Sequence, residues 1–126
     1  MALDGMATLK CGTNHLNKEQ RKMNELIPQT ILNNIPDLYA TAGELNPKCH
    51  VKLFTPNSDW NWYIIEFSKE NSDTCYGYVD GAEAELGYFS LRELEELFEV
   101  FALGVERDVC FKPTRLSKVK KMRTKE

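Results

Sequence analysis

The sequence predicts an α+β fold: a single small domain in which two helices pack on one face of an antiparallel sheet of four to five strands. Several strand patterns follow one another in the middle of the chain, with an apolar helical pattern on either side. The turns between these strand patterns span only a few residues, whereas parallel pairing needs long crossover connections. A chain of 126 residues also has room for only one hydrophobic core.

The first helix is expected after Pro28, because proline fits a first helical turn, where its missing N–H costs nothing. Pro36 ends this helix, and a loop of residues 37–47 follows. Four apolar residues fall on one helical face: Ile27, Ile31, Leu32 and Ile35.

Strands are expected at residues 50–54, 62–67, 75–79 and 85–89. The segment 62–67 carries the clearest strand pattern, since it is rich in aromatic and β-branched residues. Asn71-Ser72-Asp73 is typical of a tight turn and predicts an antiparallel hairpin between 62–67 and 75–79.

The second helix begins at a capping box, in which the Ser90 hydroxyl and the Glu93 carboxylate each accept a free backbone N–H. Gly104 fits the end of this helix, and alternating residues at 105–111 predict a last, half-exposed strand. The helix presents an apolar stripe made of Leu91, Leu94, Leu97, Phe98 and Phe101.

Three segments are expected along the chain. Residues 1–22 show little apolar periodicity and are interpreted as a flexible N-terminal extension. Residues 23–111 form the globular α+β domain, and residues 112–126 form a basic, solvated C-terminal tail. No apolar run approaches the roughly 18 residues that cross a bilayer, and the N-terminus does not resemble a secretory signal. We therefore expect a cytoplasmic protein without membrane contact.

Charge is distributed unevenly along the chain, although the net charge is only −3. The segment from Asp59 to Asp108 contains thirteen acidic and three basic residues, whereas the segment after Phe111 contains seven basic residues and one acidic residue. An acidic domain repels the phosphates of nucleic acids and favours a basic protein surface as partner. The basic tail is the part through which nucleic acid could bind.

The sequence offers no cofactor motif and no catalytic signature, so neither a cofactor nor a catalytic residue is assigned. A zinc site can be drawn from Cys49, His50, Cys75 and Cys110, but the spacing of these residues resembles no common zinc finger or ribbon. We expect the cysteines to act as small buried hydrophobic residues, and we assign no metal.

Six residues are candidates for a binding site. Trp60 lies in the loop before the central strand and is the best candidate for an exposed recognition aromatic, while most other aromatics, Trp62 among them, are typical of cross-strand packing. Acidic residues surround the hairpin, and Arg107 is expected to point inward and pair with one of them. The six candidates are Trp60, Trp62, Glu66, Glu83, Glu85 and Arg107.

Short motifs recur along the chain from Met23 to about Leu116. They are Leu26-Ile27-Pro28, Leu38-Tyr39-Ala40-Thr41, Val51-Lys52-Leu53-Phe54-Thr55-Pro56, Trp60-Asn61-Trp62-Tyr63, Glu66-Phe67, Tyr76-Gly77-Tyr78-Val79, Glu83-Ala84-Glu85-Leu86-Gly87-Tyr88-Phe89-Ser90 and Glu106-Arg107-Asp108. In this order they resemble a bacterial family catalogued as domain of unknown function 2958. The resemblance implies a small protein of plasmids, phages or conjugative elements, with no established activity.

Three classes of function follow. The first is a non-catalytic accessory protein of a mobile genetic element that binds a protein partner of unknown identity, with inhibition of a host defence nuclease (anti-CRISPR or anti-restriction type) as a specific task. The second is a single-stranded nucleic-acid-binding module that uses Trp60 and the tail. The third is an enzyme, which requires Glu66, Glu85 and Arg107 to converge in a pocket.

Overall fold

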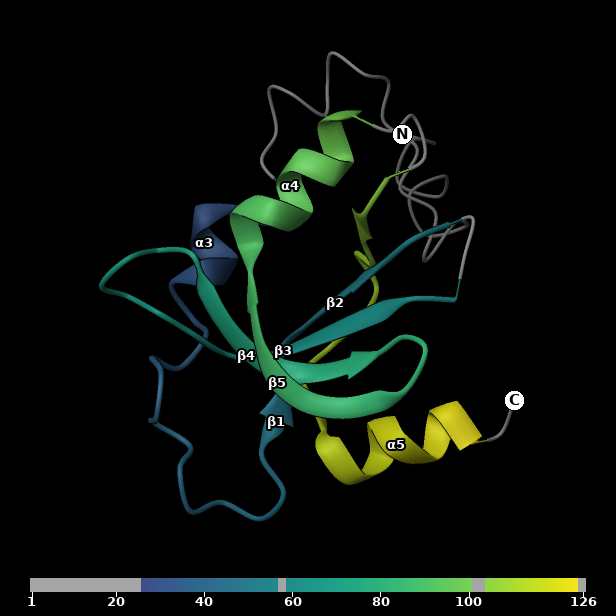
Figure 1. Cartoon of the computed structure of the whole chain (residues 1–126). Helices are drawn as coiled ribbons and strands as arrows, with labels where there is room; N and C mark the ends of the chain where they lie inside the picture. The colour runs from purple at the N-terminus through teal and green to yellow at the C-terminus, as the bar shows by residue number, and fades with distance from the viewer. Residues whose placement is uncertain (1–25, 57–58, 101–103, 125–126) are drawn as a thin grey trace, which may run out of the picture.

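A five-stranded antiparallel sheet in the order β5-β4-β3-β2-β6 forms the centre of the computed structural model, which describes residues 26–56, 59–100 and 104–124 (Figure 1). A separate two-stranded sheet pairs β1 with β7, so the predicted α+β fold is confirmed. The strands are β1 (Lys48–Cys49), β2 (Val51–Phe54), β3 (Asn61–Phe67), β4 (Thr74–Asp80), β5 (Ala84–Ser90), β6 (Glu106–Arg107) and β7 (Thr114–Arg115). The helices are α3 (Gln29–Leu32), α4 (Leu91–Val100) and α5 (Leu116–Thr124).

One face of the five-stranded sheet, which we call the α4 face, packs against α3 and α4 (Figure 1). Alternation along the strands places every second side chain on this face, where it leaves contact with water. Its core includes Leu53 of β2, Ile64 of β3 and Cys75 of β4, together with Leu91 and Leu94 of α4.

The opposite face, which we call the α5 face, is partly covered by α5 (Figure 1). Residues 112–126 were expected to form a solvated tail, but Leu116 and Val119 are buried against Tyr63, Ile65 and Tyr78. Helices therefore cover both faces of the sheet, not one as the sequence suggested. The sequence of this helix has few apolar residues and many lysines, so its packing was not expected. Two buried residues are enough to anchor it.

The start of α4 is capped by two side chains. The Ser90 hydroxyl accepts the Glu93 N–H at 3.2 Å, which is the serine half of the expected capping box. Asp73, from the turn before β4, accepts the Arg92 N–H at 2.7 Å and the Ser90 hydroxyl at 2.9 Å. The cap thus ties the helix to the hairpin turn as well as closing its first turn.

The strand expected at residues 105–111 is much shorter in the structure, where only Glu106–Arg107 form β6. Asp108 ends it, because its side chain accepts the Cys110 N–H at 3.0 Å and its carbonyl accepts the Phe111 N–H at 3.1 Å. The expected extension at residues 1–22 and the apolar residue Phe101 lie outside the described residues.

A β-bulge interrupts β3 at Ile65. Ile64 pairs with Gly77 and Glu66 pairs with Tyr76, so Ile65 is an extra residue on β3. The strands approach closely here, since a Cβ atom on Gly77 would overlap the Tyr63 carbonyl oxygen. Glycine at position 77 is therefore required by the bulge.

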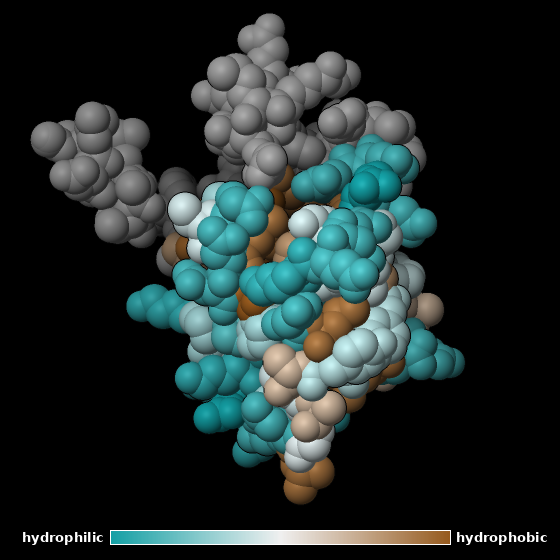
Figure 2. All heavy atoms as spheres, turned by 90° about the vertical axis from the view of Figure 1, so that its left-hand side faces the viewer, coloured by the Kyte–Doolittle hydropathy of each residue, from teal (hydrophilic) through white to brown (hydrophobic). Residues whose placement is uncertain are grey.

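Figure 2 shows the side of the molecule that faces left in Figure 1 as mainly hydrophilic, with a smaller area of hydrophobic residues near its centre. None of the helices in the described ranges has the length and apolar character needed to span a bilayer.

We expect Gly77→Ala to lower the free energy of unfolding by about 2–4 kcal/mol, because the added methyl group must displace backbone. Gly87→Ala is the matched control, since a Cβ at Gly87, the cross-strand partner of Gly77, meets no atom within 4 Å. Urea unfolding of both variants checks this. Equal stability of the two variants would contradict the close approach at the bulge.

Candidate functional site

The bulge in β3 decides where the Glu66 side chain lies. Strict alternation would place Glu66 with Ile64 in the apolar core of the α4 face. The extra residue instead turns Glu66 to the α5 face, beside its cross-strand partner Tyr76. There Glu66 is buried, with 3% of its surface exposed.

The buried Glu66 carboxylate is fully used as a hydrogen-bond acceptor. It accepts the Tyr39 N–H at 2.8 Å, the Thr41 N–H at 2.9 Å and the Thr41 hydroxyl. Tyr39 has a positive φ of 69°, which non-glycine residues rarely adopt. The carboxylate therefore holds the loop of residues 37–47 in a strained conformation, and its role is structural.

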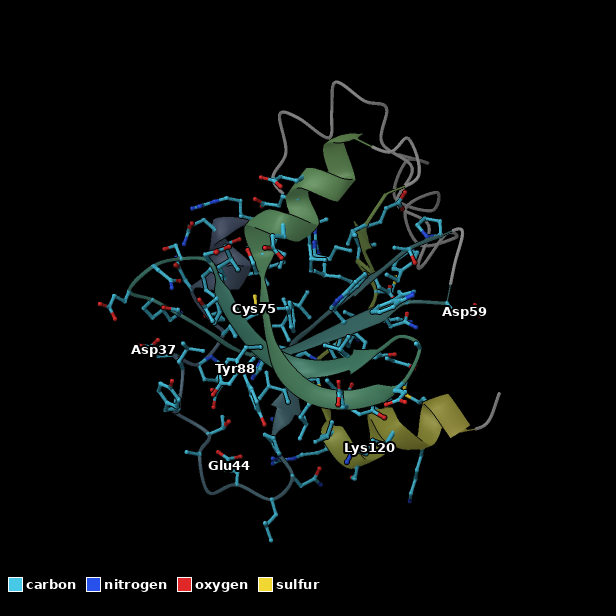
Figure 3. All side chains as sticks on the ribbon, viewed as in Figure 1. Asp37, Glu44, Asp59, Cys75, Tyr88 and Lys120 are labelled. Carbon is cyan, nitrogen blue, oxygen red and sulfur yellow. The ribbon has the colours of Figure 1, made fainter. Side chains whose placement is uncertain are left out.

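A pocket of about 230 Å³ lies beside this loop, and we call it the tyrosine pocket. Partial desolvation raises the pKa of the Tyr88 phenol, and the neighbouring Tyr39 and Glu66 side chains raise it further. Figure 3 shows Tyr88 on the same side of the molecule as Asp37 and Glu44 of the loop. The pocket is lined by Tyr39, Thr41, Ala42, Gly43, Glu44, Leu45, Pro47, Glu66, Tyr76, Leu86, Tyr88 and Leu116.

A larger cavity of about 650 Å³, which we call the polar groove, lies at the other end of the α5 face. Figure 3 shows Asp59, one of its lining residues, far from Tyr88. The polar groove crosses strands β2, β3 and β4, because several of its lining residues are cross-strand partners: Lys52 pairs with Tyr63, and Asn61 pairs with both Phe54 and Asp80. The groove is lined by Lys52, Phe54, Thr55, Pro56, Asp59, Asn61, Tyr63, Asp80, Gly81 and Met122.

Lys52 projects into an aromatic and acidic environment. Its Nζ lies 5.9 Å from the Tyr63 ring centroid and 6.0 Å from that of Phe54, within cation–π range. The same Nζ lies 3.9 Å from an Asp108 carboxylate oxygen. The Asp108 N–H donates to the Lys52 carbonyl at 3.0 Å, which fixes the two residues side by side.

Burial and, to a smaller extent, the nearby Asp80 carboxylate together raise the pKa of Tyr63 to about 12. The phenol is therefore protonated at neutral pH and acts as a hydrogen-bond donor or acceptor. Such a group is poorly suited to general acid–base catalysis near pH 7.

The two tryptophans among the candidates stack on each other, with ring centroids 5.8 Å apart and an interplanar angle of 30°. Trp62 is buried in the core of the α4 face, as cross-strand packing predicts. Trp60 is 41% exposed, and its ring covers Gly81, where any Cβ atom would overlap it. Trp60 is not among the residues that line the polar groove, although it covers Gly81, which does line that cavity.

The remaining candidates do not converge. Arg107 donates from Nε to the Leu26 carbonyl at 3.2 Å, and burial lowers the pKa of its guanidinium while Asp108 opposes that shift. Glu85 is exposed on the edge strand β5, and Glu83 is exposed in the turn before it. Arg107 pairs with Leu53 across β2 and β6, so it lies on the α4 face, whereas Glu66 lies on the α5 face. The expected pairing of Arg107 with Glu66 or Glu85 is therefore wrong.

Two of the cysteines considered for zinc are also separated, and Cys110 is disulfide-bonded, contrary to the expectation that it acts as a small buried hydrophobic residue. Cys49 lies in the core of the α5 face and Cys75 in that of the α4 face. Burial raises the pKa of each thiol to about 12, so both are protonated at neutral pH. Burial and the nearby Lys48 lower the pKa of His50. In the ranges that the structure describes, no group of three or more metal-ligating side chains forms.

The sequence alone did not identify the residues of the polar groove as a site, although several of them lie in conspicuous short motifs. Lys52, Asn61, Tyr63 and Asp108 all lie in the short motifs that carry the family resemblance. The antiparallel register of β2, β3 and β4 brings the first three together. Asp108 joins them through β6, which pairs with β2.

Residues 19–124 match the family described as Protein of unknown function (DUF2958). The chain belongs to the DUF2958 family. The match covers all the elements of the structure, from α3 to α5, and it extends through the segment expected to be a tail. No curated protein and no solved structure is significantly similar to this DUF2958 chain.

We expect Glu66→Gln to lower the free energy of unfolding by about 1–3 kcal/mol, because an amide nitrogen cannot accept the loop N–H groups and leaves buried donors unpaired. Urea unfolding measures the loss, and amide chemical shifts of Tyr39 and Thr41 report the loop. Glu70→Gln, at an exposed position in the β3–β4 turn, is the control and should change stability by less than about 0.5 kcal/mol. Unchanged shifts and stability in Glu66→Gln would contradict the structural role.

Proposed function

We propose that this DUF2958 protein is a non-catalytic, cytoplasmic accessory protein of a mobile genetic element, and that it acts by binding a protein partner. The polar groove receives a basic side chain of that partner. The specific task is inhibition of a host defence nuclease, of the anti-CRISPR or anti-restriction type.

The observation that carries the binding proposal is the way the groove already surrounds a cation. Lys52 lies within cation–π range of two aromatic rings and close to a carboxylate. Asp59 and Asp80 also line the groove, together with Asn61 and Pro56. An arginine or lysine from a partner would meet the same combination of ring faces and carboxylates there.

The placement of charge supports a protein partner. The groove is lined by two aspartates and one lysine that is already paired. Exposed basic residues lie instead on α5, where Lys120 Nζ sits 5.7 Å from the Tyr78 ring centroid. A polyanion would therefore be expected to bind along the lysines of α5, a helix that also contributes Met122 to the lining of the groove.

The groove is tested by NMR titration with two matched heptapeptides, one with arginine at its centre and one with glutamate, and with a twelve-residue deoxythymidine oligonucleotide. The arginine peptide should shift amides of Lys52, Asn61 and Gly81. Asp59→Asn/Asp80→Asn should weaken its binding about fivefold, since partly exposed ion pairs contribute up to about 1 kcal/mol each.

The control for this titration is Glu70→Gln/Glu96→Gln, which removes the same charge from exposed positions outside the groove and should leave peptide affinity unchanged. Urea unfolding of both double variants confirms that they fold. Tighter binding of the oligonucleotide, with shifts along α5 and none in the groove, would overturn the protein-binding proposal and support a nucleic-acid-binding module.

The defence task is tested by expressing the protein in bacteria that carry a defined restriction or CRISPR nuclease and measuring phage plating. Wild type should raise the efficiency of plating at least about tenfold, and Asp59→Asn/Asp80→Asn should abolish the gain. Plating that stays unchanged across these nucleases would reject the anti-defence task and leave the peptide result standing on its own.

A further inference from the structure

Strand β5 is an outer strand of the five-stranded sheet, and in the described ranges it pairs with β4 alone (Figure 1). It is seven residues long, whereas β6 at the other edge has two. A long edge strand presents a row of backbone donors and acceptors that can pair with another strand.

The register with β4 shows which backbone groups point outward. The Leu91 N–H donates to the Asp73 carbonyl at 2.9 Å, and this pair continues the β4–β5 register. Hydrogen-bonded pairs alternate in an antiparallel ladder, so Phe89, Gly87 and Glu85 are the residues bonded to β4. The outward groups are the N–H and C=O of Ala84, Leu86 and Tyr88, together with the N–H of Ser90, whose carbonyl accepts the first hydrogen bond of α4.

Exposed apolar side chains accompany this open edge. Leu86 is 42% exposed and Tyr88 is 56% exposed, and both lie on the α5 face because they pair with Tyr78 and Tyr76. Proteins usually protect such edges with proline, lysine or a bulge. Residues 84–90 contain no proline or lysine, and their register with β4 is continuous.

We propose that β5 pairs antiparallel with β5 of a second copy of this chain, around a two-fold axis at Gly87. In this register Leu86 lies opposite Tyr88 of the other copy, and Ala84 lies opposite Ser90. All four outward residues then form pairs, which gives about six backbone hydrogen bonds, because the Ser90 carbonyl of each copy is already used by α4. The two sheets become one ten-stranded sheet.

The register with its axis at Gly87 gives a partner to more of the outward residues of β5 than the two adjacent registers do. A two-fold axis at Leu86 or at Tyr88 also aligns outward residues, but each leaves one of the four without a partner. Only the axis at Gly87 lets Leu86 pack against the Tyr88 ring from the other copy at both of its equivalent positions, which combines an apolar side chain with an aromatic one.

The charges on β5 fit a second copy. Glu85 is the one charged residue within the strand, and in this register it lies opposite Phe89 of the other copy. The two Glu85 residues are four positions apart along the strand, about 14 Å at the usual rise. That separation exceeds a Debye length at physiological salt, so their repulsion is largely screened.

The dimer is independent of the binding proposal, because no residue of β5 lines the polar groove. It does involve the tyrosine pocket, since Leu86 and Tyr88 form part of its wall. Pairing of two β5 strands would place the tyrosine pockets of both copies on one continuous α5 face.

The proposal is tested by sedimentation equilibrium of the full chain over a range of concentrations. Wild type should form a dimer. Leu86→Lys/Tyr88→Lys places lysines opposite each other in both pairs and should weaken the dimer at least about tenfold. Leu86→Glu/Tyr88→Lys places opposite charges across the same pairs and should restore dimerisation, which only this register predicts.

Hydrogen exchange provides a readout of the backbone itself. The amides of Leu86 and Tyr88 should become protected as concentration rises, whereas those of Glu85 and Gly87 are protected at all concentrations by β4. Circular dichroism establishes that each variant folds. A wild-type monomer at 0.5 mM, or a dimer that survives Leu86→Lys/Tyr88→Lys with unprotected Leu86 and Tyr88 amides, would overturn the proposal.

Discussion

The bulge at Ile65 is the constraint on which the rest of the α5 face depends. It allows two consecutive residues of β3, Ile65 and Glu66, to lie on the same side of the sheet. Without it Glu66 would enter the apolar core, where an unpaired carboxylate is strongly destabilising. With it the carboxylate meets three donors from the loop of residues 37–47 and is fully satisfied. Glycine at position 77 permits this geometry, so a sheet irregularity, a buried charge and a strained loop form one connected unit.

Much of the fold could be predicted because its signals are local. The hairpin turn at 71–73 and the apolar stripe of α4 each follow from residues close together in the chain. The bulge was not predictable, because Ile64 and Ile65 read equally well as consecutive residues of a regular buried strand. The packing of helix α5 was not predicted for a different reason: a partly helical tail was expected, but its lysines indicated a solvated segment, whereas Leu116 and Val119 are buried with Tyr78 and Ile65. Such a helix gains its stability from tertiary packing.

The candidate site was less predictable than the fold, because it is assembled from segments far apart in the sequence. Glu66 was identified as a candidate, but its partners Tyr39 and Thr41 lie 27 and 25 residues earlier in a loop, and nothing in the sequence pairs that loop with β3. Arg107 was expected to meet a carboxylate and instead binds the Leu26 carbonyl, 81 residues away. The pair of Lys52 and Asp108 likewise depends on β2 and β6 being neighbours. Side-chain identity suggests chemistry, but only the strand order determines which groups meet.

The polar groove and the β5 edge represent two kinds of recognition on one sheet. The groove depends on side chains that the register of β2, β3 and β4 aligns in rows, so single substitutions alter its chemistry while the backbone stays in place. The edge depends mainly on backbone groups, which no single side chain supplies. The two regions share β4, whose Asp80 faces the groove and whose Gly77 supports the bulge. Because a bulge increases local strand twist, the same irregularity that positions Glu66 also influences how β4 presents β5 to another strand. A substitution at the bulge would therefore alter the orientation of the β5 edge, whereas a substitution that changes the charges of the groove would not.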